Sequence, residues 1–282
     1  MLGAICGDIL GSTYEFGAEK TENISKIALF REEDHFTDDT VLTLAVADWL
    51  LHDIAEDYYN DERLKDKLAH RFLMYSGKQY RDREIAYGIS YVGWLDRFET
   101  TGRHLPYHSY GNGSAMRVSP VAWAFDTLEE VRRFARLSAD VTHNHPEGEK
   151  GAEAAASAVF LARRGLAKES ILQYVRRAFG YPLNKSVAEL RVEHEFSPIC
   201  QNTLPQALMA MLEGESYEET VRLSISYGGD SDTIAAVAGA VAEALYGGVP
   251  DSILAYCKEI LDDHAIEICS EFHNRFQTPN RQ

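Results

Sequence analysis

Apolar residues recur along most of the chain at the spacing of an amphipathic helix. One such stripe consists of Val41, Leu42, Ala45, Val46, Trp49 and Leu50, and another of Ile171, Leu172, Val175 and Phe179. The alternation of apolar and polar residues that marks a half-buried strand is almost absent. The pattern therefore predicts an all-α protein, with helices at about 2–12, 38–52, 60–76, 113–125, 128–140, 147–163, 168–179, 203–213, 217–227, 231–246, 251–261 and 264–276.

Two of the predicted helices are expected to pack unusually closely. Gly3, Gly7 and Gly11 share one face of the first helix, which lowers its intrinsic stability but permits close approach of a neighbouring helix. The helix at 231–246 is mostly Ala, Val and Gly, so it is expected to lie deep in the core. Both helices adjoin acidic motifs, which indicates that they form the floor of a site. No linker divides the chain, and we predict a single domain over residues 1–282, with loops at 101–114 and 181–202.

The charge balance excludes several classes of protein. Lys and Arg number 28 against 44 Asp and Glu, which gives a net charge of −16, and 45% of the 282 residues are hydrophobic. This apolar content is too high for a disordered chain, and so acidic a surface repels nucleic-acid backbones and anionic membranes. The four cysteines form no paired motif, so we expect buried thiols. Because neither a signal peptide nor a membrane-spanning segment is predicted, we expect a soluble, cytoplasmic protein; no oligomeric state is indicated.

Two acidic motifs stand directly before strongly apolar helices. One reads Thr-Asp-Asp-Thr at 37–40, and the other Gly-Gly-Asp-Ser-Asp-Thr at 228–233. Helix capping explains one Asp at each helix start, but not two carboxylates and a hydroxyl at both. Carboxylate and hydroxyl oxygens are ligands that Mg²⁺ and Mn²⁺ prefer. The functional interpretation is therefore a site for two divalent cations, which would neutralise carboxylates that the fold brings together.

Three further features are weak signals when taken singly. The stretch Tyr-Gly-Asn-Gly-Ser-Ala-Met-Arg at 110–117 offers glycines that permit positive φ and N–H groups that suit a phosphate, although Gly-Asn-Gly is also an ordinary turn. His143 lies in Thr-His-Asn-His-Pro at 142–146, which fits a metal ligand or the end of a helix, and no familiar zinc spacing accompanies it. Glu15 alone reads as a solvated acid. No serine or cysteine lies in a nucleophile motif.

Together, and in this order, the motifs resemble the ADP-ribosylglycohydrolase family, which includes the dinitrogenase reductase activating glycohydrolases. The resemblance rests on Gly-Asp-Ile-Leu-Gly-Ser-Thr-Tyr-Glu at 7–15, the motifs at 37–40 and 111–117, Thr142-His143, and the motif at 228–233. It implies an orthogonal helical bundle with two Mg²⁺ or Mn²⁺ ions at the floor of a cleft. The implied reaction is hydrolysis of the bond between C1″ of ADP-ribose and an acceptor, either a modified protein side chain or a small ADP-ribose conjugate.

The resemblance also implies roles for individual residues. The implied metal ligands are Thr37, Asp38, Asp39, Asp230, Asp232 and Thr233, and the stretch that holds the diphosphate is Gly111, Asn112, Gly113, Ser114, Ala115 and Met116. His143 matches a histidine that lines the ADP-ribose cleft, and Glu15 matches a glutamate beside the metals. Glu15 or Asp39 is expected to be the general base toward water or the general acid toward the leaving group, and the sequence does not choose between them.

One segment departs from the family pattern. Arginine-directed members carry an Asp-Ile-Gly-Asn type motif where this chain has Glu84-Ile85-Ala86-Tyr87-Gly88-Ile89. If this segment contacts the acceptor, arginine is not favoured, and serine-linked, other O-linked and small-molecule acceptors stay open. Two other functions fit the acidic motifs, namely a dinuclear-metal phosphohydrolase acting on a nucleotide and a non-catalytic ADP-ribose-binding protein. The presence of all four aspartates and Glu15 argues against the second.

Overall fold

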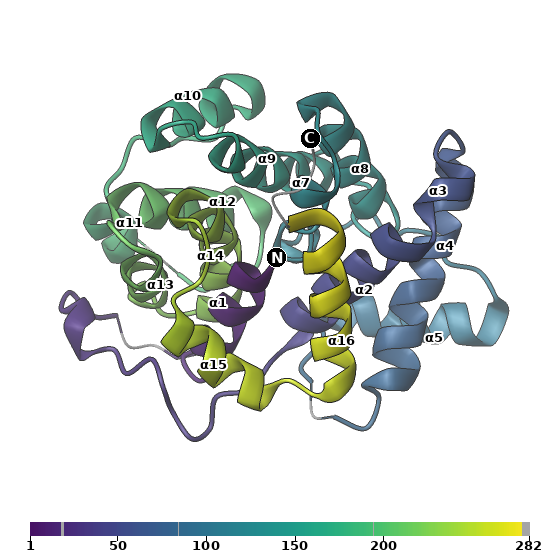
Figure 1. Cartoon of the computed structure of the whole chain (residues 1–282), viewed down its shortest axis with the longest axis horizontal. Coiled ribbons are helices and arrows are strands. Elements are labelled where there is room, and N and C mark those ends of the chain that lie inside the picture. The colour runs from purple at the N-terminus through teal and green to yellow at the C-terminus, as the bar shows by residue number, and fades with distance from the viewer. Residues whose placement is uncertain (18–19, 84, 194, 278–282) are drawn as a thin grey trace.

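The computed structural model describes residues 1–17, 20–83, 85–193 and 195–277, which are mostly helical (Figure 1). The helices are α1 (Leu2–Ser12), α2 (Asp38–His52), α3 (Ile54–Asp57), α4 (Asp61–Met74), α5 (Ile89–Thr101), α6 (Gly113–Met116), α7 (Val121–Ala124), α8 (Leu128–Asp140), α9 (Pro146–Arg163), α10 (Lys168–Phe179), α11 (Val187–Glu193), α12 (Cys200–Glu213), α13 (Tyr217–Ile225), α14 (Ser231–Tyr246), α15 (Asp251–Ile260) and α16 (Asp263–Phe272), with a 3₁₀ turn η1 (Ile24–Lys26) and π-helical turns η2 (Tyr75–Gln79) and η3 (His273–Gln277). Within the described ranges no β-strand occurs, and extended backbone pairs only in two isolated bridges, Gly17 with Gly229 and Gly111 with Ile199. The all-α prediction is confirmed.

Helix α1 packs along α14 near the middle of the molecule, and glycines form the contact (Figure 1). A Cβ atom on Gly7 would lie 2.2 Å from the carbonyl oxygen of Ala235, and one on Gly11 would lie 2.6 Å from Cα of Asp232. No side chain larger than hydrogen fits at these positions, which confirms the close approach expected from the glycine spacing. Because the contact reaches the last turn of α1 and the first turn of α14, it brings the end of one helix to the start of the other.

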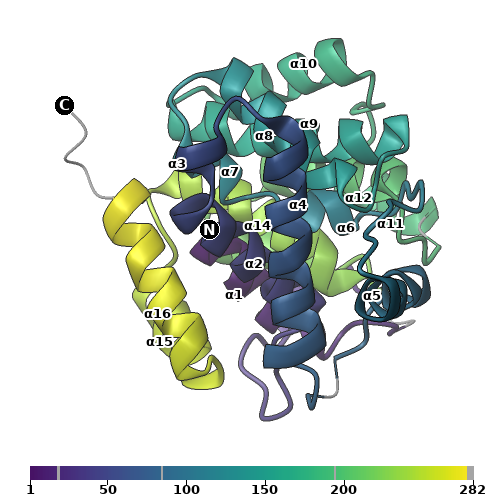
Figure 2. The ribbon, with the colours of Figure 1, turned by 90° about the vertical axis from the view of Figure 1, so that its right-hand side faces the viewer.

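The remaining helices surround this pair. Helices α9, α12 and α13 pack on α14, while α2 packs on α1 and is covered by α4 and α16. Helices α8 and α10 pack on α9, and Figure 2 shows α15 and α16 on the same side of the molecule. The large side chains Trp49, Phe72, Trp94 and Phe134 are fully buried between the helices, and this removal of apolar surface from water is the main stabilising contribution. All four cysteines are free and buried, as expected.

Some helices differ from the sequence prediction. No helix is predicted over α5, although Tyr91, Trp94, Leu95 and Phe98 form its buried face at helical spacing. Helix α11 lies within the segment 181–202 that was expected to be a loop. The single helix expected at 113–125 is instead the two short helices α6 and α7. The interruption arises because Pro120 has no N–H group to continue the first helix, and it stands at the N-cap of the second.

Helix starts agree well with the sequence, because side-chain caps mark them. The Thr127 hydroxyl accepts a hydrogen bond from the Glu130 N–H at 3.3 Å, and the Ser216 hydroxyl accepts one from the Glu219 N–H at 3.1 Å. In the part of the chain that the structure describes, no helix combines the length and apolar character needed to cross a lipid bilayer.

Candidate functional site

Asp8, in the middle of α1, fixes the start of α2. Its buried carboxylate accepts hydrogen bonds from the backbone N–H groups of Thr37 and Thr40, each at 3.0 Å. It also accepts from the two threonine hydroxyls, at 2.8 Å for Thr37 and 2.5 Å for Thr40. The Thr37 hydroxyl in turn caps α2 by accepting from the Asp39 N–H at 3.3 Å. The motif at 37–40 is therefore held in place through α1, and Asp38 and Asp39 stand in the first turn of α2.

The second acidic motif opens α14. Gly228 and Gly229 have φ angles of 71° and 70°, in the left-handed region that glycine adopts without strain. This turn leads Asp230 to the N-cap of α14 and Asp232 into its first turn. The Asp230 carboxylate accepts a hydrogen bond from the side-chain amide of Asn112, so the motif at 228–233 is joined directly to the glycine-containing stretch at 111–116.

The two acidic motifs meet at Asp39. The Thr233 hydroxyl of α14 donates to Oδ2 of Asp39 in α2 at 3.1 Å. The other carboxylate oxygen of Asp39, Oδ1, and Oδ1 of Asp232 are buried and have no hydrogen-bond partner among the described residues. A buried carboxylate oxygen without a donor is unfavourable, so these two atoms are well suited to bind a cation.

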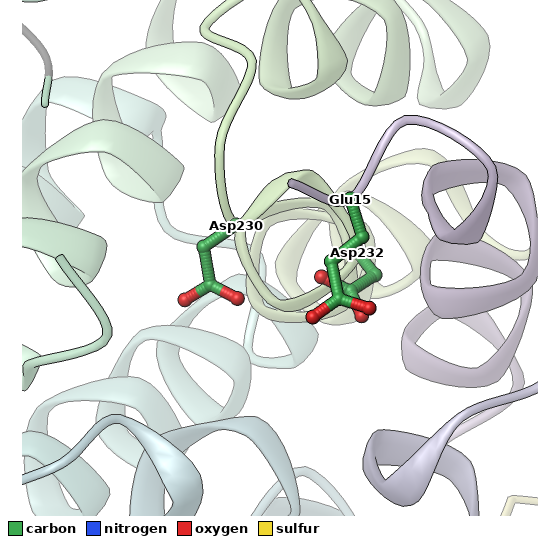
Figure 3. Close-up of side chains that lie close together, drawn as sticks. All are labelled: Glu15, Asp230 and Asp232. Atoms are coloured by element: carbon green, nitrogen blue, oxygen red, sulfur yellow. The ribbon is translucent and has the colours of Figure 1, made fainter. Parts of the chain in front are cut away.

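Glu15 completes the cluster from the turn that follows α1. Glu15, Asp230 and Asp232 each offer a carboxylate oxygen, and these three oxygens lie within 4.8 Å of one another. Figure 3 shows the three carboxylates pointing in a common direction from the turn after α1 and the start of α14. Glu15, which sequence spacing alone left as a solvated acid, thus lies in a partly buried acidic group.

Burial and mutual repulsion determine the pKa values of the clustered carboxylates. Burial, followed by repulsion from neighbouring carboxylates, raises the pKa values of Asp38, Asp39 and Asp232 well above their usual range. Burial and the charges of Asp230 and Asp8 raise the pKa of Glu15 to about 7. No lysine or arginine is among the largest causes of these shifts, and none forms an ion pair with these carboxylates in the described chain; the one cation whose pKa responds to the cluster is Arg117, which is affected by the charge of Asp38. Oxygen donors without a counter-charge fit a hard divalent cation.

The stretch at 111–116 lies beside the cluster and is tied down by its neighbours. Asn112 donates its N–H to the Pro198 carbonyl at 3.0 Å, and its own carbonyl accepts from the N–H groups of Ala115 and Met116 at 2.8 and 3.0 Å. These three N–H groups are therefore already occupied. In the described part of the chain, the N–H groups of Gly113 and Ser114 have no acceptor, which leaves them as the donors a ligand would meet.

His143 closes the other side of this stretch. Its ring is buried, and a Cβ atom on Gly113 would lie only 3.1 Å from its Nε2 atom. Neither Gly111 nor Gly113 has a positive φ angle, so the left-handed conformation considered for them is not adopted. The absent side chain of Gly113 instead leaves room in front of the histidine.

Two residues, Asp8 within the site and Phe16 beside it, could not be identified from spacing. Asp8 was visible only as an acid inside an apolar helix, a signal of a buried role. Phe16 follows Glu15 with a φ angle of 59°, which is strained for an aromatic residue, and its N–H donates to the Gly229 carbonyl at 2.8 Å. Its exposed ring lies 5.5 Å from that of Phe196, measured between centroids. No periodic pattern identifies this pair.

The segment that departs from the arginine-directed pattern includes a tyrosine that is affected by the charge of Asp38. Glu84 lies outside the described residues, whereas Tyr87 is partly buried near Asp38. Burial, and then the negative charge of Asp38, raise the pKa of the Tyr87 phenol. Burial and the same charge act on Tyr107, which follows α5. The charge of Asp38 therefore acts on two tyrosines, of which Tyr87 belongs to the segment considered for acceptor contacts.

Known proteins match most of the chain, and a family model matches all of it. A family model described as ADP-ribosylglycohydrolase matches residues 1–282. ADP-ribosylhydrolase ARH3 of Mus musculus and that of Homo sapiens are each 28% identical over 92% of this chain, which spans 86% and 88% of their lengths. ADP-ribosylarginine hydrolase Tri1 of Pseudomonas putida (strain GB-1) is 28% identical over 89% of this chain and 71% of its own length.

A solved structure supports the same assignment. It is described as an ADP-ribosylglycohydrolase-related protein complex and superposes with a TM-score of 0.69 at 26% identity, covering 97% of this chain and 95% of that one. The full-length match of the family model and the shared helical fold agree with the five motifs and their order. The chain belongs to the ADP-ribosylglycohydrolase family.

Proposed function

We propose that this protein hydrolyses the glycosidic bond between C1″ of ADP-ribose and an acceptor, which is a modified protein side chain or a small ADP-ribose conjugate. The observation that carries the proposal is the carboxylate cluster where α1, α2 and α14 meet. In it, Oδ1 of Asp39 and Oδ1 of Asp232 are buried without a hydrogen-bond donor from the described chain. Family membership adds the substrate class.

Two divalent cations, Mg²⁺ or Mn²⁺, are the cofactors we propose for this cluster, because its donors are all hard oxygen atoms. The proposed ligands are Thr37, Asp38, Asp39, Asp230, Asp232 and Thr233. When bound, such ions supply positive charge that polarises water and orients hydroxyl groups. The chain's own contribution is to hold these side chains in fixed positions, through the hydrogen bonds of Asp8 and the close contact between α1 and α14.

We assign proton transfer to Glu15, with Asp39 as the second candidate. Glu15 is only partly buried, so water and a leaving group can reach it. Asp39 is buried and accepts the hydroxyl of Thr233, which suits a ligand better than a mobile proton carrier. In this assignment Glu15 accepts a proton from the attacking water, or donates one to the leaving acceptor, in a bond cleavage with oxocarbenium-like character.

The proposed ADP-ribose contacts are the stretch from Gly111 to Met116 and His143. The free N–H groups of Gly113 and Ser114 are the donors expected to meet the diphosphate. A valine at Gly113 would place its Cβ 3.1 Å from Nε2 of His143 and fill the space a ligand needs. We expect Gly113→Val to weaken ADP-ribose binding by about tenfold or more, measured by calorimetry, with unchanged helix content by circular dichroism. Binding as tight as wild type would contradict this contact.

The acceptor is best identified by a direct assay. The purified protein would be incubated with Mg²⁺ or Mn²⁺ and with ADP-ribose attached to arginine, to serine or to an acetyl group, and the products separated by chromatography. Intact ADP-ribose as product is the expected result. Because the Tyr87 segment replaces the arginine-directed motif, we expect an O-linked substrate to be cleaved faster than the arginine-linked one.

Two outcomes would favour the alternatives. Release of AMP or inorganic phosphate would identify a dinuclear-metal phosphohydrolase. ADP-ribose binding in calorimetry, with no turnover of any substrate in the presence of metal, would identify a non-catalytic binding protein. The cytoplasmic location and the single domain expected from the sequence stay predictions.

A further inference from the structure

Arg117 is a fully buried cation that forms no ion pair in the described chain, and Asp38 is the carboxylate whose charge acts on it. Its Nη2 atom donates to the Ser138 carbonyl at 2.9 Å and to the Thr142 hydroxyl at 2.7 Å, while Nε and Nη1 have no acceptor. The guanidinium carbon lies 4.4 Å from the centroid of the Phe72 ring. Burial lowers the pKa of Arg117 to about 10, so the side chain remains charged at neutral pH. Burying an arginine is costly when one of its donors meets only a neutral hydroxyl, so this arrangement calls for a functional explanation.

Thr142 connects this arginine to the site. Its buried hydroxyl oxygen accepts from Arg117 and lies 2.7 Å from Nδ1 of His143. If Nδ1 carried a proton, two donors would point at the Thr142 oxygen, and the hydroxyl proton of Thr142 would have no acceptor among the described residues. If Nδ1 is bare, the Thr142 proton goes to it, and the hydroxyl and Nδ1 are both satisfied. This second arrangement avoids leaving the buried Thr142 hydroxyl as an unpaired donor, which costs about 1–3 kcal/mol.

His143 is then a neutral ring whose other nitrogen carries the proton. Burial, and after it the Arg117 cation, lower the pKa of His143 well below its ordinary value. Its Nε2 atom has no hydrogen bond to any described residue and faces the glycine stretch. A Cβ on Gly113 would lie 3.1 Å from it and one on Gly111 3.5 Å. A protonated Nε2 is therefore a donor aimed at the space those two glycines leave open.

We propose that Arg117 and Thr142 are positioning residues that fix His143 as the neutral Nε2–H tautomer, so that the ring presents a hydrogen-bond donor to an acceptor oxygen of the ligand bound at Gly111 and Gly113. The tautomer stands on the hydrogen bonds of the chain itself. The ligand contact rests on the proposed function. Replacing Arg117 by any residue that cannot donate would leave Thr142 free to turn its proton elsewhere, and the tautomer would no longer be fixed.

The tautomer is measured without any ligand or metal. Protein labelled with ¹⁵N-histidine would be studied by long-range ¹H–¹⁵N correlation spectroscopy at neutral pH, and His143 would be identified among the ten histidines by its absence from a His143→Gln spectrum. The expected signals are a pyridine-like Nδ1 and a pyrrole-like Nε2. The reverse pattern, an equal mixture, or a doubly protonated ring would overturn the proposal.

Substitutions at Thr142 test the positioning role. Thr142→Val keeps the shape but removes the hydroxyl, and we expect it to scramble the tautomer of His143 and to weaken ADP-ribose binding about tenfold. Thr142→Ser restores the hydroxyl and should return both properties to nearly wild-type values. Thr220→Val is the matched control, because Thr220 is equally buried and its hydroxyl donates to the Ser216 carbonyl at 2.9 Å, in α13. It should change neither property.

The two hypotheses fail in different ways. If Thr142→Val leaves the tautomer and the affinity as they are in wild type, the positioning role is wrong. If wild-type protein shows the Nε2–H tautomer but binds no ADP-ribose, the proposed function fails while the Arg117–Thr142–His143 arrangement stands.

Discussion

Buried carboxylates occur in two settings in this protein, and the contrast separates structure from chemistry. Glu153 in α9 is as buried as the site aspartates, but it accepts hydrogen bonds from Arg132 at 2.8 Å and from Arg136 at 2.8 and 2.6 Å. Asp48 in α2 likewise accepts from Arg71 at 2.7 Å and from Tyr75 at 3.0 Å. In both cases the chain supplies its own positive charge.

The site carboxylates are treated differently by the same fold. Asp39, Asp230 and Asp232 receive hydrogen bonds only from neutral groups, or from none, in the described chain. A buried charge is costly unless it is paired, so the missing partner must come from outside the polypeptide if these groups are to be ionised. The chain thus pairs the carboxylates of Glu153 and Asp48 with its own arginines, whereas the carboxylates of the site are left to bind an external cation.

Removing one charge from each class of buried carboxylate should have the largest effects. Asp39→Asn keeps the shape of the side chain, and we expect it to abolish turnover because the metal is lost. In the metal-free protein the same change should leave the free energy of unfolding unchanged or raise it, since it relieves repulsion between like charges. Turnover with Mg²⁺ or Mn²⁺, and urea unfolding in a chelator, measure the two effects.

Glu153→Gln is the matched control for that substitution. It leaves Arg132 without a carboxylate and Arg136 with only the longer contact to Glu149 at 3.9 Å. Because both arginines are partly exposed, we expect a loss of about 2 kcal/mol in unfolding free energy. Turnover per folded molecule should stay near wild type. If Asp39→Asn destabilised the metal-free protein as much as Glu153→Gln does, helix capping would explain the acidic motif and the metal assignment would be lost.

Within the cluster, Glu15→Gln separates proton transfer from binding. We expect kcat to fall by about 10²-fold, because a general acid or base is removed, while the affinity for ADP-ribose changes little. Steady-state kinetics on the best substrate and calorimetry with ADP-ribose test this. Normal turnover would transfer the acid/base role to Asp39.

Added metal should stabilise the protein through the cluster alone. At a free Mg²⁺ or Mn²⁺ concentration 100 times its Kd, the gain in unfolding free energy is about 2.7 kcal/mol, and Tm rises with metal concentration. Asp232→Asn should reduce this shift, whereas Glu153→Gln should retain it from a lower starting Tm. A Tm that neither ion changes in the wild-type protein would exclude the proposed site.

The smallest expected effect concerns Glu149, a carboxyl outside the site with a like neighbour. Burial and the charge of Asp140 raise the pKa of Glu149 to about 7 from an ordinary value of 4.5. Between these two pH values the folded state therefore keeps a proton that the unfolded state releases. The contribution of Glu149 to the unfolding free energy is thus complete below pH 4.5 and is lost as the pH rises through about 7. Glu149→Gln should flatten that slope in urea unfolding measured across this pH range. An unchanged slope would show that other groups produce it.

Much of the helical framework could be predicted, because its signals are local. Helix starts at Asp38, Leu128, Tyr217 and Ser231 agree with the structure, since capping side chains and apolar stripes lie within a few residues of each other. Helix α5 could not be predicted in the same way, because Gly88 and Gly93 weaken its local signal and its buried aromatic face is stabilised by tertiary packing. Helix α11 has only seven residues, too few for a periodic pattern.

The candidate site could be predicted only in part from the sequence. The aspartates are visible in the sequence as two pairs. However, the hydrogen bond from Thr233 to Asp39 joins residues 194 positions apart, and no sequence spacing predicts such a contact. The same holds for Asp8, whose four hydrogen bonds define the start of α2. The motifs therefore identified the charged side chains. Only the fold shows which of these charges have no oppositely charged side chain paired with them.

The glycine contact between α1 and α14 limits which substitutions this protein can accept during evolution. In an exposed helix, replacing Gly by Ala adds about 1 kcal/mol of stability, so a search for sturdier variants would favour it. At Gly7 or Gly11 the added methyl group would meet backbone atoms at 2.2 or 2.6 Å and push apart the helices that bear Asp8 and Asp232. Selection for a stronger first helix and selection for catalysis therefore oppose each other at these positions.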